Sequence, residues 1–125
     1  MSDKKHILVV EDEKALSHAL QIKLESEGYQ VSIAEDGKEA SEMIETGNFD
    51  LILLDVIMPR MDGFNFLMFL KGSGHTDTPV MVLSNLGQDE DIEKAKSLGA
   101  TDYMVKANAP FARIIESVTD ILGGK

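Results

Sequence analysis

The chain has 125 residues, a net charge of −10 and no cysteine, which excludes disulfides and thiolate metal sites. The length fits one domain, 1–125 with an ordered core at about 6–122, that buries about two thirds of the surface its unfolded chain exposes. No cluster of basic residues accompanies aromatics, so we expect no direct nucleic-acid binding, because phosphate contacts supply most of that affinity.

The first half of the chain alternates strand and helix patterns. Residues 6–10 form a buried strand. The apolar run within it, 7–10, is far too short for a signal-peptide core or a membrane span, so we expect a cytoplasmic protein without membrane insertion. The next helix ends at Gly28, a typical C-terminal cap. Residues 29–34 alternate in polarity as an edge strand does. A short helix then begins at Asp36 and Gly37 and ends near Gly47.

The central strand follows. Residues 51–54 are four consecutive apolar residues, which indicates a strand covered on both faces, and this strand ends at Asp55. A helix at about 63–71 is apolar around nearly its whole surface, with Met68 among its apolar members. After a loop at 72–79, residues 80–83 form a fourth buried strand that ends at Ser84 and Asn85.

The last part of the chain predicts two helices around one strand. The acids at 89–91 suit the start of a helix and Gly99 suits its end, but only Ile92, Ala95 and Leu98 between them are apolar. We therefore expect this helix to be thinly anchored. Residues 101–105 form the fifth strand, which ends at Lys106. The last helix starts at Pro110 and has apolar residues at helical spacing, namely Phe111, Ile114, Ile115, Val118 and Leu122.

Five strands that alternate with five helices predict an α/β fold, because right-handed crossovers produce a parallel sheet covered on both faces. Among known doubly wound, flavodoxin-like sheets, five strands fit the order 2-1-3-4-5. In this order the ligand site lies at the carboxyl ends of strands 1 and 3. Those two ends carry Glu11, Asp12 and Asp55.

The ends of four strands together place Glu11, Asp12, Asp55, Ser84 and Lys106 on one rim. Carboxylates held that close repel one another unless a cation joins them, and Mg2+ suits an all-oxygen site on a shallow rim. A carboxylate beside Mg2+, a hydroxyl and a lysine is suited to accept a phosphoryl group. Each residue alone has an ordinary explanation: a polar turn at Asp55, a loop bond at Ser84, solvation of Lys106.

The chain resembles the receiver domain of two-component response regulators over almost its whole length. The resemblance is carried by Val-Glu-Asp-Glu at 10–13, Asp-Val-Ile-Met-Pro-Arg-Met-Asp-Gly at 55–63, Ser84, Gly-Ala-Thr-Asp-Tyr at 99–103, and Lys106. It implies that Asp55 accepts a phosphoryl group from a phosphohistidine on a sensor histidine kinase or a phosphotransfer protein. The chain is then a phosphoacceptor and not an enzyme.

The same resemblance implies roles for the other residues of the rim. Asp12 and Asp55 bind Mg2+ directly, Glu11 acts through water, and the backbone carbonyl of Ile57 completes the protein ligands. Ser84 and Lys106 bind phosphoryl oxygens. Tyr103 is the aromatic switch that turns inward, or else a half-buried strand residue without a signalling role. The face formed by residues 89–122 then meets a downstream protein target or a fused output domain.

Three positions depart from the family pattern. Asn85 stands where a small residue is usual, which alters access to the site. Ala107 follows Lys106 where proline is common, which puts the usual cis peptide in doubt. Ile57 and Leu86 stand where polar residues assist hydrolysis, so we expect slow self-dephosphorylation.

Three alternatives stay open. The first is a receiver-like interaction module that is never phosphorylated, against which the intact acidic set argues. The second is a phosphatase with Asp55 as nucleophile, but Ile57 stands where such enzymes place a second carboxylate. The third is a flavin- or nucleotide-binding module. Its phosphate loop after the first strand should be rich in glycine or hydroxyls, whereas the acids at 11–13 would repel a phosphate that lacks a metal.

Overall fold

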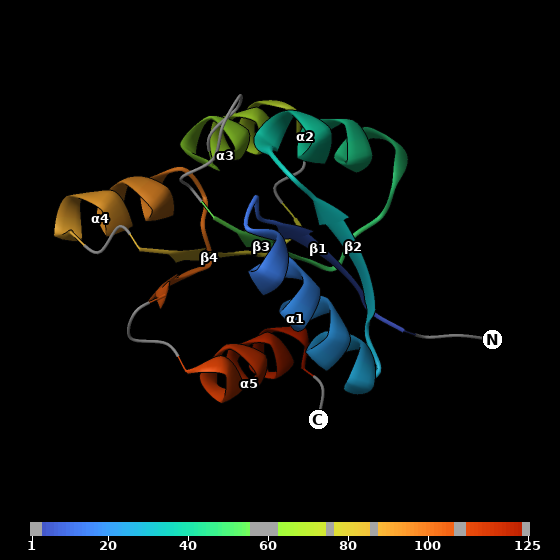
Figure 1. Ribbon diagram of the computed structural model, residues 1–125. Helices are drawn as coiled ribbons and strands as arrows, with labels where there is room; N and C mark the ends of the chain where they lie inside the picture. Colours follow the sequence, from blue (N-terminus) through green and yellow to red (C-terminus); the bar gives the residue numbers. More distant parts are fainter. Residues whose placement is uncertain (1–3, 56–62, 75–76, 86–87, 107–109, 124–125) are drawn as a thin grey trace.

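The computed structural model describes residues 4–55, 63–74, 77–85, 88–106 and 110–123. In these residues one parallel sheet has the strand order β2-β1-β3-β4-β5, which confirms the predicted doubly wound order (Figure 1). The strands are β1 (His6–Val10), β2 (Gln30–Ala34), β3 (Leu51–Leu54), β4 (Val80–Ser84) and β5 (Asp102–Val105). The strand predicted at 29–34 lies at the edge of the sheet, as expected, but it begins one residue later, at Gln30.

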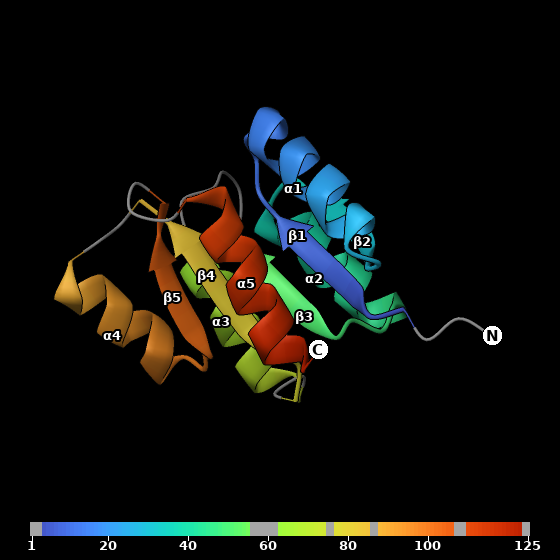
Figure 2. The ribbon, with the colours of Figure 1, turned by 90° about the horizontal axis from the view of Figure 1, so that it is seen from below.

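Helices cover both faces of the sheet. They are α1 (Lys14–Ser26), α2 (Gly37–Thr46), α3 (Gly63–Gly72), α4 (Asp89–Ser97) and α5 (Phe111–Leu122). Helices α1 and α5 lie on one face, and α2, α3 and α4 lie on the other (Figures 1 and 2). No helix in the described part of the chain is long and apolar enough to cross a lipid bilayer.

The central strands form because their apolar runs can be buried on both sides. Residues 7–10 of β1 and 51–54 of β3 are at most 2% exposed. The short helix α2 begins where the Asp36 carboxylate accepts a hydrogen bond of 2.8 Å from the backbone N–H of Glu39. Helix α1 ends before Gly28, whose φ of +98° is a conformation that glycine adopts at little cost.

Two hydrophobic cores lie on the two sides of the sheet. The core under α1 and α5 contains Ile7, Val9, Leu20, Leu24, Val31, Leu51, Leu53, Met81, Leu83, Ile114, Ile115 and Val118. The core under α2, α3 and α4 contains Leu8, Val10, Ala34, Ala40, Ile44, Ile52, Leu54, Phe66, Leu67, Leu70, Val80, Val82, Ala95 and Ala100. Successive residues of each strand alternate between the two cores, so the strands are fixed from both faces.

Two local details differ from the sequence-based expectation. In α3 the buried side chains include Phe66, Leu67 and Leu70, whereas Met68 is 54% exposed, because only one side of this apolar helix faces the sheet. Strand β5 begins one residue later than expected. Thr101 still bonds Val80, but it does so once through its own N–H and once through its hydroxyl, so it does not continue the strand ladder.

Helix α4 is thinly anchored, as predicted. Among its residues only Ala95 is buried. Two lysines add contacts with α3: the Lys94 ammonium lies 4.4 Å from the centre of the Phe64 ring, and the Lys71 ammonium donates a hydrogen bond of 3.3 Å to the Ser97 carbonyl. The position of α4 therefore depends on exposed, long side chains as much as on burial.

Candidate functional site

The register of the sheet brings the acids at the ends of β1 and β3 together. Val10 pairs with Leu54, so the next residue of each strand, Glu11 and Asp55, lies at the same rim. The Asp55 N–H donates to the Val10 carbonyl and the Glu11 N–H donates to the Ala34 carbonyl, each at 3.0 Å. Both carboxylates are thus mounted on hydrogen-bonded backbone at the last position that the sheet can hold.

Lys106 follows the edge strand β5 and reaches these acids along the same rim of the sheet. Its Nζ lies 3.0 Å from Oε1 of Glu11 and 3.1 Å from Oδ2 of Asp55. Strand β4 lies between β3 and β5, but it ends at Ser84, which pairs with Val105. Because β4 ends with a small residue one position before the lysine, the four-carbon side chain of Lys106 can cross that strand end and reach Asp55.

Three carboxylates form a candidate metal centre. Glu11, Asp12 and Asp55 each offer one oxygen, and the three oxygens lie within 4.8 Å of one another. Glu11 and Asp55 are buried and Asp12 is exposed, so the group lies partly inside the rim and partly open to solvent. All the donor atoms are oxygens, which hard divalent cations such as Mg2+ and Ca2+ prefer. These residues fit such a cation by their chemistry and by their spacing.

Burial and neighbouring charges change the proton affinity of the site. Burial raises the pKa of the Glu11 carboxyl, as does the negative charge of Asp55, and the hydrogen bond from Lys106 offsets only part of this increase. Burial lowers the pKa of the Lys106 ammonium, but its bonds and charge interactions with Glu11 and Asp55 outweigh burial and leave that pKa raised. Lys106 therefore stays cationic and balances acids that repel each other.

Ser84 and Tyr103 lie beside this group. Ser84 is fully buried at the end of β4. Tyr103 is half-buried in β5, and burial raises the pKa of its hydroxyl, as do the charges of Asp91 and Asp55, whereas a hydrogen bond with Ser84 acts in the opposite direction. Tyr103 is thus near Ser84, and the family resemblance implies that a movement of Ser84 makes Tyr103 turn inward.

Glu13 is a residue that the sequence reasoning did not assign to the site. Its backbone N–H donates a hydrogen bond of 3.1 Å to Oε2 of Glu11, and its own carboxylate lies 4.0 Å from the Lys106 ammonium. The backbone of Glu13 therefore fixes one oxygen of Glu11 while Lys106 holds the other. The only sequence signal was its position in the acidic run at 11–13, which does not show what its N–H binds.

The structure brings together Glu11, Asp12, Asp55 and Lys106, with Ser84 and Tyr103 next to them. Ile57, whose carbonyl the resemblance implies as a metal ligand, lies outside the described residues, as do Leu86 and Ala107. The described set provides a carboxylate, a place for a cation, a hydroxyl and an ammonium within one rim. In this combination the carboxylate can attack the phosphorus of a phosphoryl group, and the cation, the hydroxyl and the ammonium can stabilise the negative charge on its oxygens.

Comparison with known sequences points to one family. The sequence profile of the response regulator receiver domain matches residues 7–119. Response regulator MprA of Mycobacterium tuberculosis is 42% identical over 108 residues, which cover 85% of this chain and 44% of that protein. Transcriptional regulatory protein DltR of Streptococcus agalactiae is 40% identical over 100 residues, which cover 80% and 44%. The chain spans about half the length, or less, of the curated relatives it matches.

Solved structures agree. The receiver domain of the Francisella response regulator 1452 superposes with a TM-score of 0.90 at 32% identity, covering 96% of this chain and 98% of that one. Response regulator TrrA of Thermotoga maritima, solved in complex with Mg2+ and BeF, gives a TM-score of 0.80 at 30% identity, covering 94% and 98%.

Proposed function

The chain belongs to the response regulator receiver domain family, and we propose that Asp55 is its phosphoacceptor in a two-component signalling pathway. The observation that supports this most directly is the placement of the Asp55 carboxylate, which lies at the end of the buried strand β3 with Oδ2 3.1 Å from the Lys106 ammonium. In the proposed reaction an Asp55 oxygen attacks the phosphorus of a phosphohistidine. The P–N bond breaks, and the imidazole nitrogen of the donor takes the electron pair.

Mg2+ is the proposed cofactor. Asp12 and Asp55 would hold it directly and Glu11 through water, with the Ile57 carbonyl as a further ligand that follows from the resemblance. A bound Mg2+ neutralises charge on the transferring oxygens. The fold places Asp55 beside Asp12. Lys106 and the Glu13 N–H hold Glu11, so the acids are in position before a cation binds.

Ser84 and Lys106 are proposed to bind the transferred group. A phosphoryl group adds about −1.5 to −2 charges, so the rim needs new donors to balance it. Lys106 already lies beside Asp55 and can exchange one carboxylate oxygen for a phosphoryl oxygen. The Ser84 hydroxyl can donate a second bond, and in doing so it changes the bond that it now makes with Tyr103.

The response is proposed to travel from Ser84 into α4. The segment that starts at Ser84 leads to this helix, which buries only Ala95, so a small displacement of it costs little free energy. The surface formed by 89–122 would then change and meet the partner, either a separate protein or an output domain in the same polypeptide. The cytoplasmic location expected from the sequence stays a prediction.

Phosphorylation can be tested with small donors. The wild-type chain, an Asp55→Asn variant and an Asp120→Asn control are incubated with acetyl phosphate, with and without Mg2+. The mass of each intact protein is then measured by mass spectrometry. We expect the mass of one phosphoryl group to appear on the wild type and on the control, only with Mg2+, and to be missing on Asp55→Asn. Asp120 is exposed on α5, so its variant changes the charge equally without touching the rim.

The interaction-module alternative makes the opposite prediction. If a saturating donor leaves the mass of the wild type unchanged, and beryllofluoride with Mg2+ gives no bound fluorine signal by NMR, Asp55 is not a phosphoacceptor. For the phosphorylated wild type we expect a lifetime of minutes or longer, measured by the decay of the added mass. A lifetime of only seconds would contradict slow self-dephosphorylation.

A further inference from the structure

The side chain of Glu13 lies at the phosphoryl rim, although its place in the chain suits another use. Glu13 is the N-cap residue of α1, where a side-chain oxygen ordinarily accepts a hydrogen bond from a backbone N–H of the first turn. The Glu13 carboxylate makes no such bond within this turn, all of which the structure describes. It lies instead 4.0 Å from the Lys106 ammonium. The roles proposed above use only the backbone of Glu13, so its carboxylate has no assigned part in the site.

Lys106 compensates the charge of Glu13 only weakly. Its ammonium already bonds Glu11 at 3.0 Å and Asp55 at 3.1 Å, so Glu13 is the most distant of three carboxylates around one positive charge. The Glu13 side chain is also 64% exposed, and an ion pair with so exposed a partner contributes little. The rim therefore keeps a negative charge at Glu13.

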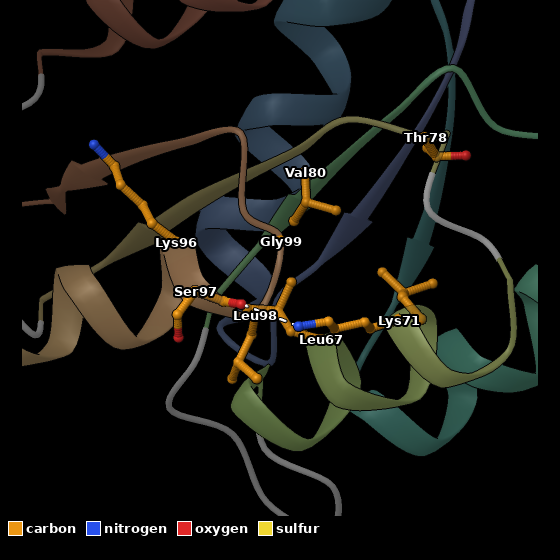
Figure 3. Close-up of a pocket in the computed structure, with 9 residues that line it drawn as sticks. Leu67, Lys71, Thr78, Val80, Lys96, Ser97, Leu98 and Gly99 are labelled. Carbon is orange, nitrogen blue, oxygen red and sulfur yellow. Dashed lines mark hydrogen bonds between the residues drawn. The ribbon is translucent and has the colours of Figure 1, made fainter.

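Other lysines do not compensate this charge. Lys14 follows Glu13 directly, but its ammonium lies 3.5 Å from the Glu35 carboxylate. Lys71 lies at the opposite end of the sheet, beside the hollow between α3 and α4, where its ammonium donates to the Ser97 carbonyl at 3.3 Å (Figure 3). Among the described residues, the Glu13 carboxylate has its one ion pair with the ammonium at the rim.

Glu13 lies on the solvent side of Lys106. Side-chain exposure rises from 7% for Asp55 to 15% for Lys106 and 64% for Glu13. The carboxylates of Glu13 and Asp55 approach the same ammonium, at 4.0 and 3.1 Å, so these two oxygens lie less than about 8 Å apart. That is about the distance over which salt screens a charge at physiological ionic strength. A phosphodonor that reaches Asp55 from solvent therefore interacts with the charge of Glu13.

We propose that the Glu13 carboxylate selects phosphodonors by their charge, an inference that rests on Asp55 being the phosphoacceptor. It repels a donor more strongly the more negative the donor is. It therefore disfavours acyl phosphates, which are dianions, more than donors with a P–N bond, whose nitrogen can carry a proton. Phosphohistidine belongs to the second class. In both classes an Asp55 oxygen attacks phosphorus; the acyl phosphate releases a carboxylate, and the P–N donor releases a nitrogen that takes the electron pair.

The test compares two small donors, acetyl phosphate and phosphoramidate, the second of which is a monoanion at neutral pH. Their second-order rate constants of phosphorylation are measured by intact mass at saturating Mg2+ and low ionic strength. Glu13→Gln should raise the rate constant for acetyl phosphate about threefold or more, and that for phosphoramidate less than about twofold. High salt should remove most of the gain for acetyl phosphate. Glu13→Asp keeps the charge and should change both rate constants less than Glu13→Gln does.

A matched control separates this effect from net charge. Glu25 is exposed near the other end of α1, so Glu25→Gln makes the same chemical change away from the rim and should leave both rate constants as in the wild type. Unchanged rate constants in Glu13→Gln, an equal gain for both donors, or a gain that salt does not reduce would each overturn selection by charge and leave Asp55 as the acceptor. If neither donor phosphorylates the wild type, the function proposed for Asp55 fails and this inference fails with it.

Discussion

Helices α4 and α5 are the last two helices of the described chain, and they are held in very different ways. Helix α5 has 12 residues and buries Ile114, Ile115 and Val118 against the sheet. Helix α4 has 9 residues and buries only Ala95. Full burial of an isoleucine or valine stabilises by about 1.5–3 kcal/mol, against about 0.8 kcal/mol for one methyl-sized group. Burial alone therefore fixes α5 several times more strongly than α4.

This difference in burial indicates which helix can change its position while the rest of the domain stays folded. A helix held by three buried side chains moves only if the core moves with it. A helix held by one alanine and by exposed lysine contacts can shift while the core stays intact. Because α4 follows the strand that ends at Ser84, the easily displaced helix is also the one that is connected directly to the candidate phosphoryl site.

The largest difference between α4 and α5 is expected when one apolar side chain is truncated in each helix. Ile114→Ala should reduce the free energy of unfolding by about 3 kcal/mol, because it leaves a cavity beneath α5. Ile92→Ala, the same change at a partly exposed position of α4, should cost less than about 1 kcal/mol. Urea denaturation monitored by circular dichroism measures both losses. Similar losses in the two variants would show that α4 is not thinly anchored.

Native-state hydrogen exchange compares the two helices without substitution. Amides in α4 should exchange at least about tenfold faster than amides in α5, since a difference of about 1.4 kcal/mol in opening free energy gives a factor of ten. Beryllofluoride with Mg2+ should change the exchange of α4 more than that of α5, because α5 is held by the core. Exchange in α4 that is the same with and without the phosphoryl mimic would argue against its proposed part in the switch.

Mg2+ should stabilise the domain without removing the difference between the helices. At a free concentration about ten times its dissociation constant, it should add about 1.4 kcal/mol to the free energy of unfolding. Asp12→Asn should lose most of this gain, because Asp12 supplies one of the three clustered carboxylates. Thermal unfolding with and without Mg2+ gives the measurement. Asp120→Asn is the matched control and should keep the full gain.

The smallest effect concerns the lysine contacts of α4. Lys94→Met removes the cation over the Phe64 ring but keeps a long apolar side chain, so it should cost about 0.5–1 kcal/mol. Lys96→Met on the same helix removes an equal charge without this contact and should cost less. Urea denaturation of the two variants measures both losses of stability, and hydrogen exchange of the α4 amides gives a second measurement. Equal costs would mean that the ring contact adds nothing to the anchoring of α4.

The sequence was sufficient for the central strands β1 and β3, because short continuous apolar runs favour strands that are buried on both faces. Residues 7–10 and 51–54 are continuous apolar runs of strand length, and both are buried on two faces. The acids that follow these runs then had to lie at the carboxyl rim of a parallel sheet. The order of the strands came from known doubly wound proteins and not from the residues themselves.

Other features could not be predicted because the pattern contains no signal for them. Helix α3 is apolar on nearly every side, so periodicity could not show that Phe66 faces the core and Met68 faces solvent. The contact of Lys106 with Glu11 depends on the rotamer of a long side chain, and the bond from the Glu13 N–H depends on the turn after β1. Such contacts follow from the folded backbone and not from residue types at fixed spacing.

The reach of Lys106 also links the two halves of the chain during folding. Strands β1, β2 and β3 all come from the first 55 residues. Glu11 and Asp12 follow β1 and Asp55 follows β3, whereas the balancing lysine follows β5. A partly assembled sheet that lacks β5 would confine three acids without a counter-charge. Docking of β5 brings the ammonium of Lys106 to these acids and relieves the repulsion, so we expect the lysine to make assembly of the sheet more cooperative.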